Sequence, residues 1–509
     1  MPFNPHSRAG YGALVKESSA DTPTFPTVFF EVISENITVD WAKTPIMQVA
    51  GKVDKNMRFA QEKVVINGTV ELYCEPKTLG YFLQNFFGDA SSSILEADVS
   101  ILHTFQSSFT DPDTFTYEFQ VANSGYVRRF SGCKITGMTV TQENNLVKVS
   151  LNIEAKYTFT NARVLTEVAT LNALHVDQTK GLTTSDSIIV INPTTLVTIA
   201  EYTITAVVDE THLTVSTIAH TLMVDAIVVI KAQTPTYSLL PEFTYHGGAS
   251  YGMHPDMAET AAKNLEDFSI EFIREAEVFH AGAGFDIVHR MPAAIRLKSL
   301  EVKGMMKRYY DTEEFLDMLR QKEEFAIRLE CRNGTALGSN AQVAATNTYG
   351  DTVNGFSVTA TDALAFDGEV GNDLHVVLEI AIDDVLVAAI SGHKVTVSLA
   401  NTTSSNNTGT LIAAAIGALT GVDSAAEGTG AEEFITATTR KYLAGGRDEK
   451  EKAALFIDIY KCNYDPFDVE IGEDNIVTQD MNYTARHLTD GDDTGTARVR
   501  LRNNITAYT

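Results

Sequence analysis

Apolar and polar residues alternate along most of this chain, and this period of two predicts half-buried β-strands. The segment 147–155 illustrates the pattern, because Leu151 and Ile153 fall on one face while Asn152 and Glu154 fall on the other. Similar alternation, rich in Val, Ile, Thr, Phe and Tyr, occurs in residues 114–121, 134–140, 268–273 and 454–460. One dry and one wet face are typical of antiparallel sheets, so we expect a mainly β protein.

Two short amphipathic helices are predicted among these strands. The first follows Pro76, with Thr78 as its N-cap and Gly88 at its end. Its apolar positions recur at helical spacing, at Leu79, Phe82, Leu83 and Phe86. The second begins at Thr312 as its N-cap and carries acidic residues in its first turn, where the helix dipole favours them. Each predicted helix follows a predicted strand.

This order of predicted elements occurs twice along the chain. Residues 29–40 correspond to residues 264–273, and each stretch leads through a strand to a Thr-capped helix. Two long strands joined by a polar loop follow each helix, at 133–141 and 146–159 in the first half and at 454–462 and 469–484 in the second. We interpret this as an internal duplication of one strand-helix-strand module. Two unrelated α+β domains are the alternative.

Two stretches lie outside the repeated order and are predicted to be inserted domains. Residues 166–235 contain short strands separated by turn residues, which predicts a small all-β insert. Residues 334–445 are rich in Gly, Ala, Ser, Thr and Asn, and loops tolerate such long insertions. The predicted organisation is a first module with an N-terminal arm over 1–165, the small insert over 166–235, a second module over 236–333 plus 446–509, and a surface-exposed inserted domain over 334–445.

Size and charge narrow the class of protein. The 509 residues, 44% of them hydrophobic, suffice for about three or four domain cores. Acidic residues outnumber basic ones by 66 to 39, which gives a formal net charge of -27. Such a surface repels nucleic-acid phosphate, so a conventional DNA-binding protein is not expected. A charge that serves solubility alone is the alternative interpretation.

Neither a disulfide framework nor a membrane span is predicted. The cysteines, Cys74, Cys133, Cys331 and Cys462, lie far apart without a CxxC pair, so we expect them to be reduced and buried. The longest apolar stretches, such as 411–419, fall well short of the roughly 20 residues that a membrane span needs. We therefore expect a protein that is made in, and soluble in, the cytoplasm.

The motifs predict no catalytic, metal or nucleotide site. The histidines are scattered without an H-E-x-x-H spacing. The sequence from Tyr245, YHGGA, resembles part of a lipase oxyanion loop, but G-x-S-x-G is absent and a turn is the preferred interpretation. Acidic pairs such as Asp465 with Asp468 are interpreted as solvated loops. We expect no enzymatic activity and no cofactor.

The N-terminal stretch carries a more specific signal, which lies in the order of its parts. It runs through YGALVKE at 11–17, TVFFEVISENI at 27–37, WAKTP at 41–45, a Gly-Lys pair at 51–52 and GTVELYCEPKTLGYFL at 68–83. A strand ends in a Glu-Asn turn, a Trp/Pro arm and a Gly-Lys turn follow, and a second strand leads through Glu-Pro into a short helix. This order resembles the tail tube proteins of siphophages and the related tubes of contractile tails. The resemblance covers about the first 160 residues and reaches the second half only through the duplication.

The resemblance implies a structural virion protein, a major tail tube protein. Each module would be a small β-sandwich or barrel whose inner sheet joins its neighbours into a closed β-barrel around a DNA channel. Tube proteins with one such module form hexamers, so two modules per chain imply a homotrimer with pseudo-sixfold symmetry; a hexamer of chains is the alternative. The implied partners are other copies of the chain, the tape measure, tail terminator and distal tail proteins, and transiently passing DNA. The implied location is the virion tail, assembled in the host cytoplasm, with no membrane partner.

The resemblance also implies roles for particular residues. The segment 40–58 would be an arm that reaches the adjacent ring, with Trp41, Lys43, Pro45, Gly51, Lys52 and Arg58 as its candidate contacts. Burial of Trp41 in its own core is the alternative. Glu118 and Glu154 lie at alternate positions of long strands and are candidates for lumen-facing acids that keep DNA from sticking to the wall.

Two other classes of protein remain as alternatives. A cell-surface or carbohydrate-binding β-sandwich adhesin would share the Thr-rich strands and the inserted domains. A glycan-cleaving enzyme would need a cleft with paired carboxylates.

Overall fold

A computed structural model gives the fold, and the predicted mainly β class is confirmed. It describes residues 10–508 apart from 20–21, 47–57, 89, 97–99, 107–110, 121–126, 144, 160–161, 168–171, 219–221, 238–241, 253–259, 262–264, 281–291, 310–323, 337–343, 351–353, 362–373, 392–393, 444–451, 466–468, 472–476 and 491–492. The second predicted helix, from Thr312, lies outside these residues.

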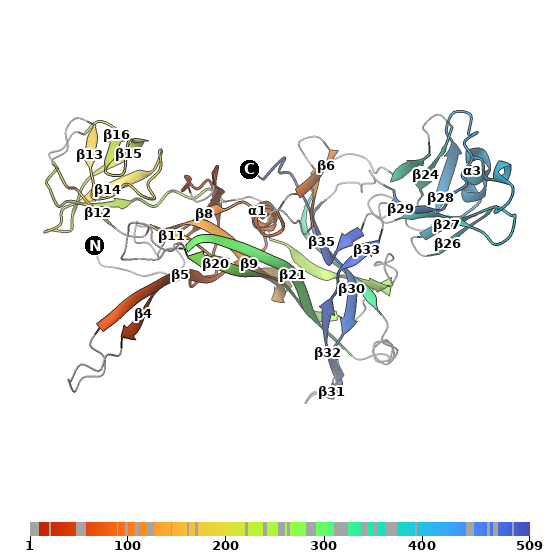
Figure 1. The fold of residues 1–509 in the computed structure, drawn as a ribbon, viewed down its shortest axis with the longest axis horizontal. Helices are drawn as coiled ribbons and strands as arrows, with labels where there is room; N and C mark the ends of the chain where they lie inside the picture. The colour runs from red at the N-terminus through yellow and green to blue at the C-terminus, as the bar shows by residue number, and fades with distance from the viewer. Residues whose placement is uncertain are drawn as a thin grey trace.

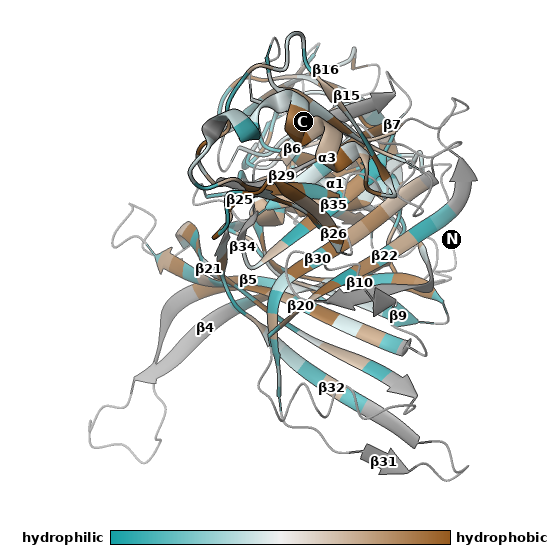
Figure 2. Ribbon diagram, turned by 90° about the vertical axis from the view of Figure 1, so that its right-hand side faces the viewer, coloured by the Kyte–Doolittle hydropathy of each residue, from teal (hydrophilic) through white to brown (hydrophobic). Residues whose placement is uncertain are grey.

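One curved antiparallel sheet runs through both halves of the chain (Figures 1 and 2). Its strands, in spatial order, are β3 and β4 (Ser34–Glu35 and Thr38–Ile46), β5 (Arg58–Tyr73), β10 (Leu146–Glu154), β9 (Val127–Glu143), β20 (Leu265–His280), β21 (Pro292–Tyr309), β32 (Val477–Ala485) and β31 (Val469–Ile471). The two halves of the chain meet where β9 pairs with β20.

The alternation that predicted these strands places their apolar side chains in one core. On β10, Val149, Leu151 and Ile153 are buried, while Asn152 is exposed and Glu154 is half-buried. Figure 2 shows hydrophilic and hydrophobic residues alternating along the long strands. The sheet therefore has one face packed on the core and one open face.

Helix α1 (Pro76–Phe87) packs against the core, but it begins before the predicted cap. Its N-cap is Glu75 and Pro76 is its first residue, because proline has no N–H to lose there and its φ already suits a helix. Thr78 is therefore not the cap; its hydroxyl donates to the Glu75 carboxylate at 2.7 Å. The helix ends at Gly88 as predicted, and this residue adopts a φ of 98° that favours glycine.

The apolar face of α1 joins the two halves of the chain. Phe82 meets Phe30 edge-on at 5.1 Å, whereas Phe86 and Phe87 meet Phe272 of β20 at 6.4 and 5.6 Å between ring centroids. These helix side chains are fully buried, and each contributes about 1.5–3 kcal/mol of hydrophobic stabilisation. The helix thus fixes β20 against the first half.

A second set of strands pairs in the same way in each half. In the first half, β1 (Gly12–Lys16) pairs with β2 (Val28–Phe30) and with β8 (Phe115–Gln120), and β9 pairs with β8 and with β11 (Tyr157–Thr158). In the second half, β18 (Thr244–Gly252) pairs with β19 (Thr260–Ala261) and with β22 (Phe325–Ala336), and β30 (Lys452–Tyr464) pairs with β22 and with β35 (Ala497–Asn503). All of these pairings are antiparallel, and they follow one order in both halves.

The pairing registers also repeat. Phe115 lies opposite Cys133 and Phe325 lies opposite Cys462, and in both strands the register shifts before the next pair. Three residues after these phenylalanines, Glu118 lies opposite Arg129, as Arg328 lies opposite Asp458. The two ion pairs thus occupy one position of the repeat with their charges exchanged.

Two further lobes lie at opposite ends of the molecule in Figure 1. The first contains β12 (Arg163–Val164), β13 (Ala173–His175), β14 (Ser187–Ile191), β15 (Thr198–Val207), β16 (His212–Val215) and β17 (Ile227–Ile230). The second contains β23 (Thr346–Tyr349), β24 (Phe356–Ala360), β25 (His375–Ile380), β26 (Val387–Ser391), β27 (Lys394–Leu399), η4 (Ser404–Asn407), α3 (Gly409–Gly417), β28 (Val422–Ala426) and β29 (Thr438–Tyr442). Each lobe has a hydrophobic core cluster that is largely its own. The remaining elements are β6 (Ala90–Glu96), β7 (Ser100–Gln106), β33 (Leu488–Asp490) and β34 (Asp493–Gly495).

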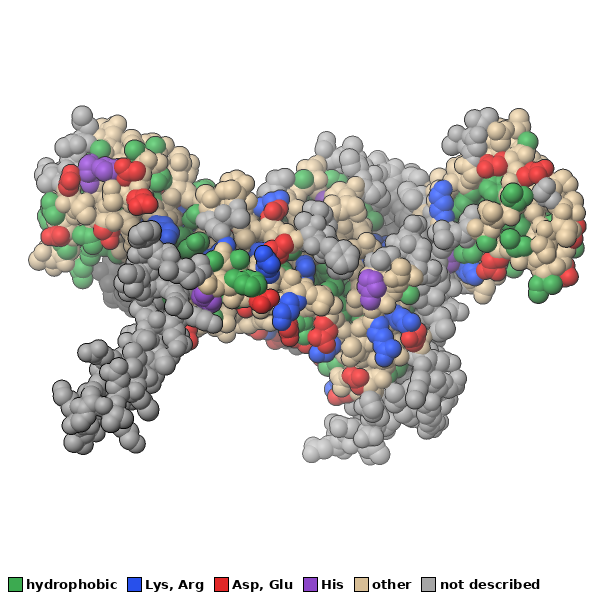
Figure 3. Space-filling model, viewed as in Figure 1, with side chains coloured by type: hydrophobic (Ala, Val, Ile, Leu, Met, Phe, Trp, Pro, Cys, Tyr) green, Lys and Arg blue, Asp and Glu red, His purple; other side chains and the backbone are tan. Residues whose placement is uncertain are grey.

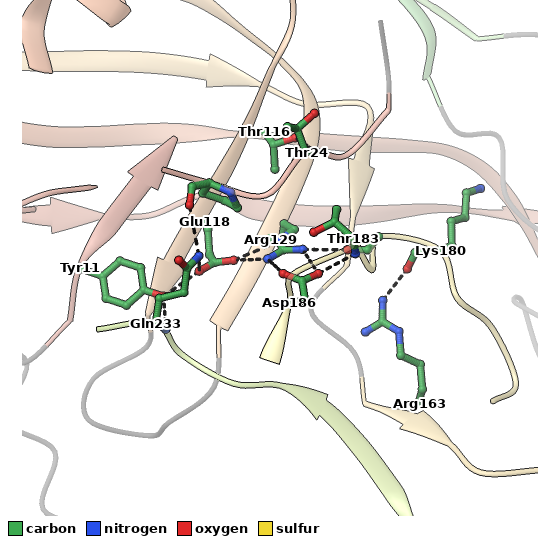
Figure 4. A network of polar contacts seen from close by, with 12 residues as sticks. Tyr11, Thr24, Thr116, Glu118, Arg129, Arg163, Lys180, Thr183, Asp186 and Gln233 are labelled. Carbon is green, nitrogen blue, oxygen red and sulfur yellow. Dashed lines mark hydrogen bonds and ion pairs between the residues drawn. The ribbon is translucent and has the colours of Figure 1, made fainter. Parts of the chain in front are cut away.

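A buried ionic network ties the first lobe to β8 and to the start of β9 (Figure 4). Arg129 on β9 is 0% exposed and contacts Glu118 at 2.6 Å and Asp186 of the lobe at 2.7 Å. The Tyr11 hydroxyl donates to Glu118 at 2.7 Å and accepts from the backbone N–H of Gln233 at 2.9 Å. Burial would lower the pKa of Arg129, but Asp186 and Glu118 more than offset this and raise it. The network therefore holds the guanidinium charged.

Removing the Asp186 carboxylate should loosen this attachment. We expect Asp186→Ala to lower the free energy of unfolding by about 2–4 kcal/mol, because Arg129 stays buried with one of its two carboxylate partners lost. Urea unfolding followed by circular dichroism measures the change. Asp209→Ala, which removes the partner of His212 at the surface, is the matched control and should change little. Equal losses from both substitutions would contradict the assignment.

Candidate functional site

The open face of the curved sheet is a polar surface to which both repeats contribute. Alternate residues of the long strands project from it, away from α1 and the core. Among the described side chains these are Asn67, Thr69 and Glu71 on β5, Lys148, Ser150, Asn152 and Glu154 on β10, Glu271 and Glu275 on β20, Glu301 and Lys303 on β21, and Asp480 and Asn482 on β32. The face is hydrophilic and carries both signs of charge.

Many of its acidic groups have a lysine beside them. Lys148 lies 3.3 Å from Glu71, and Lys303 lies 2.7 Å from Glu301. These groups are partly exposed, so each pair contributes little to stability. Figure 3 shows acidic and basic side chains intermingled over the middle of the molecule. The pairing moderates the charge of this face but leaves acids such as Glu271 exposed.

Glu154, one of the two predicted lumen acids, projects from this face. It borders a shallow depression between β5, β9 and β10 together with Asn36, Asn67, Thr136 and Asn152. Partial burial raises the pKa of the Glu154 carboxyl. The depression is therefore lined by amides and hydroxyls around one acid whose charge is poorly solvated.

Glu118, the other predicted lumen acid, is in the wrong place for that role. Its side chain is 0% exposed and is held by Arg129 and Tyr11 beneath the first lobe. The period of two correctly predicted that Glu118 lies on a strand, β8. However, β8 pairs with the part of β9 that leaves the curved sheet for the other layer. Both faces of β8 are thus covered, and Glu118 cannot face a channel.

The two ends of the curved sheet are strand edges. Among the described strands, β3 and β4 pair only with β5, and β31 pairs only with β32. At the first edge, the backbone N–H of Ile37 donates to Glu35 at 2.9 Å and its carbonyl accepts from Arg128 at 2.6 Å. Burial raises the pKa of Glu35 against the opposing effect of Arg128. The backbone polar groups of Ile37 are thus satisfied within the chain.

The predicted arm is in part a β-hairpin. Trp41, Lys43 and Pro45 lie on β4 and are paired with β5, whose first residue, Arg58, lies opposite Ile46. Gly51 and Lys52 lie outside the described residues, which also exclude the helix cap predicted at Thr312. The predicted arm therefore begins as a continuation of the curved sheet.

The structure adds acids that sequence reasoning did not name. Glu271, Glu275, Glu301 and Asp480 share the open face with Glu154. They occupy alternate positions of strands, which is the signal that selected Glu154, but only the pairing of β20 with β9 shows that both halves contribute to one face.

Metal clusters and membrane-spanning helices are both absent from the described part of the chain. It contains no group of three or more His, Cys, Asp or Glu residues placed to hold a metal ion. Within the same residues, no helix is both long and apolar enough to span a membrane.

The comparison with known families bears directly on these surfaces. Residues 9–228 match the family model described as phage tail tube protein. Over these residues, which are less than half of the chain, it is similar to the phage tail tube family. The match covers the first repeat and most of the first lobe, so the resemblance seen in the sequence is confirmed. No curated protein matches the chain.

The similarity to the tail tube family gives the open face and the edges a context. Tail tube proteins are components of the virion tail. The surfaces that matter in such a protein are those that can contact further copies and the interior of the tube.

The raised pKa of Glu154 predicts a pH-dependent penalty for its charge. When the pKa of a carboxyl is higher in the folded than in the unfolded state, the protein becomes less stable as the pH rises above the pKa of the unfolded state. We therefore expect Glu154→Gln to raise the thermal midpoint at pH 7 and to have little effect below about pH 4. Thermal unfolding at the two pH values measures this, with the exposed Glu271→Gln as control. A stabilisation that is independent of pH would contradict the burial of the charge.

Proposed function

We propose that this chain is a major tail tube protein that self-assembles into stacked rings, which form the channel for DNA passage from the capsid to the host. The match of residues 9–228 to the tail tube family model supports a tube component, and one observation carries the proposal further. Within a single chain, the sheet of the first half already joins the sheet of the second through β9 and β20. Edge-to-edge joining of repeats is the contact from which a closed barrel is built.

The repeat supports three chains per ring. The matching pairings of the two halves indicate two modules per chain, over residues 1–165 and over 236–333 plus 446–509, with inserted domains between and within them. Rings of six single modules are what the resemblance to tail tubes implies, so three chains of two modules would close the same ring. A ring of six chains is the alternative. Such an interface joins two different patches of neighbouring chains and closes by rotation.

The open face of the sheet would line the channel. It carries Glu154, Glu271 and Glu275, and exposed carboxylates repel the phosphates of passing DNA. The neighbouring lysines are engaged by acids, as Lys298 is by Glu275 at 3.0 Å, so few cations are left to bind phosphate. We propose these acids in place of Glu118.

The hairpin of β4 and β5 would reach the adjacent ring. It continues beyond the curved sheet towards residues 47–57, and Trp41, Lys43, Pro45 and Arg58 lie on its strands. Tape measure, tail terminator and distal tail proteins would contact the lumen and the ends of the tube. The role is structural, assembled in the host cytoplasm, without an enzymatic site or a membrane.

Electron microscopy of the purified protein tests the proposal. We expect hollow tubes with a regular axial repeat in negative stain. Native mass spectrometry of single rings should give three times the chain mass of 55.5 kDa. A monomer at all concentrations would refute self-assembly, and a ring mass of six chains would replace the trimer by the alternative.

A shortened hairpin separates ring formation from stacking. Ile46 and Arg58 lie opposite each other, so residues 47–57 can be replaced by a two-residue Asn-Gly turn without removing β4. We expect rings that do not stack into tubes. Replacing residues 491–492 by Asn-Gly, between the paired Asp490 and Asp493, is the control and should leave tubes intact. Normal tube growth by the shortened hairpin would disprove the arm.

A further inference from the structure

The junction between the two halves of one chain has a defined register. On β9, Val140 lies opposite Ile270 of β20 and Thr141 lies opposite Ser269. On its other side, the same strand has Val140 opposite Val149 of β10. These two pairings of β9 therefore define, residue by residue, how the second half of the chain joins the first.

The second half contains a strand that corresponds to β9 and pairs with its neighbour in the same register. As Val140 lies opposite Val149, Val469 of β31 lies opposite Gln479 of β32, and Glu470 occupies the position of Thr141. The strand β31 therefore corresponds to the part of β9 that binds β20. Among the described strands, nothing pairs with the outer side of β31.

The first half contains the counterpart of β20. Glu35 lies opposite Val70 and Thr38 lies opposite Asn67, which places Ile37 beside Gly68. A Cβ on Gly68 would approach the Ile37 Cα to 2.4 Å, so this close approach requires glycine. In the second half, Ile270 lies opposite Gly304 in the same way. Ile37 and Asn36 thus correspond to Ile270 and Ser269.

We propose that the outer edge of β31 pairs antiparallel with the β3–β4 edge of a second copy, in the register that β9 and β20 already use. This places Val469 opposite Ile37 and Glu470 opposite Asn36 of the neighbouring copy. The inference rests on the proposed ring and adds to it the two edges and their alignment. Repeating one junction at every module boundary leaves no open edge, which is what a closed ring requires.

The Asn36 position is suited to a direct test. Its backbone N–H donates to the Thr69 carbonyl of β5 at 3.1 Å, so its backbone polar groups point inward. Towards an outer antiparallel partner it occupies a non-hydrogen-bonded position, where facing residues lie closest. A cysteine there and one opposite it would lie within reach of a disulfide.

The experiment is oxidative cross-linking of assembled tubes that carry Asn36→Cys and Glu470→Cys. The native cysteines are all buried, and burial raises the pKa of the Cys74, Cys133 and Cys462 thiols, so they stay unreactive. We expect covalent dimers and trimers on a non-reducing gel, with trimers as the largest species. The control, Thr38→Cys with Glu470→Cys, is two residues out of register and should cross-link at least ~10-fold less.

The outcomes separate this inference from the proposed function. If tubes form but the matched cysteine pair does not cross-link, or the control pair cross-links equally, the proposed register is wrong and the proposed tube function is unaffected. A chain that never assembles overturns the proposed function. If the double variant alone fails to assemble, the two single variants are mixed, and covalent dimers are then expected. In the unmodified protein, the amides of β31 should become protected from hydrogen exchange on assembly, and unchanged exchange would overturn the pairing.

Discussion

The pairing of β9 with β20 is the interaction on which the rest of the molecule depends. It joins two repeats of one chain edge to edge, and backbone hydrogen bonds make such a joint insensitive to side-chain identity. The two halves have diverged so far that their residues barely align, yet their strands pair in matching registers. Helix α1 reinforces the joint, because Phe86 and Phe87 pack on Phe272 of β20. A curved sheet with one polar face follows from this contact.

The exchanged ion pairs show how the repeats diverged without losing the fold. Asp458 is fully buried beside Arg328 at 2.7 Å, and Arg498 and Arg500 contact it as well. Burial alone would raise the pKa of Asp458, but these guanidinium groups outweigh it and hold that pKa far below its ordinary value. The first half solves the same problem with Arg129 between two carboxylates. Either sign suffices at this position, provided that the buried charge is compensated.

Much of the fold could be predicted from the sequence, since the period of two marks strands and faces directly. Residues 147–155 have the predicted alternation, and within the predicted correspondence of residues 29–40 with 264–273, β3 and β4 pair with β5 in the register in which β20 pairs with β21. The residues of the candidate site were harder to predict from the sequence. Glu118 and Glu154 carry the same local signal, but β9 crosses from one layer to the other, and only the pairing of distant strands separates a buried acid from an open one. The start of α1 was missed because Thr78 is a good cap by type, whereas Pro76 takes the first helical position.

A chain with two open strand edges must avoid pairing wrongly before it assembles. At the β3–β4 edge, Glu35 and Arg128 hold both backbone polar groups of Ile37 inside the chain, and the Asn36 side chain accepts from the Thr69 backbone N–H at 2.6 Å. An incoming strand therefore finds fewer free donors and acceptors than an ordinary edge would offer. Because each capped group has a partner already, indiscriminate pairing gains little there. A partner in the proposed register places Val469 at the hydrogen-bonded position opposite Ile37, so its backbone bonds would replace the contacts with Glu35 and Arg128. It also meets an edge whose shape the chain already matches within itself. Specificity at this edge thus arises both from the backbone groups that are capped within the single chain and from the register that the edge offers to a partner.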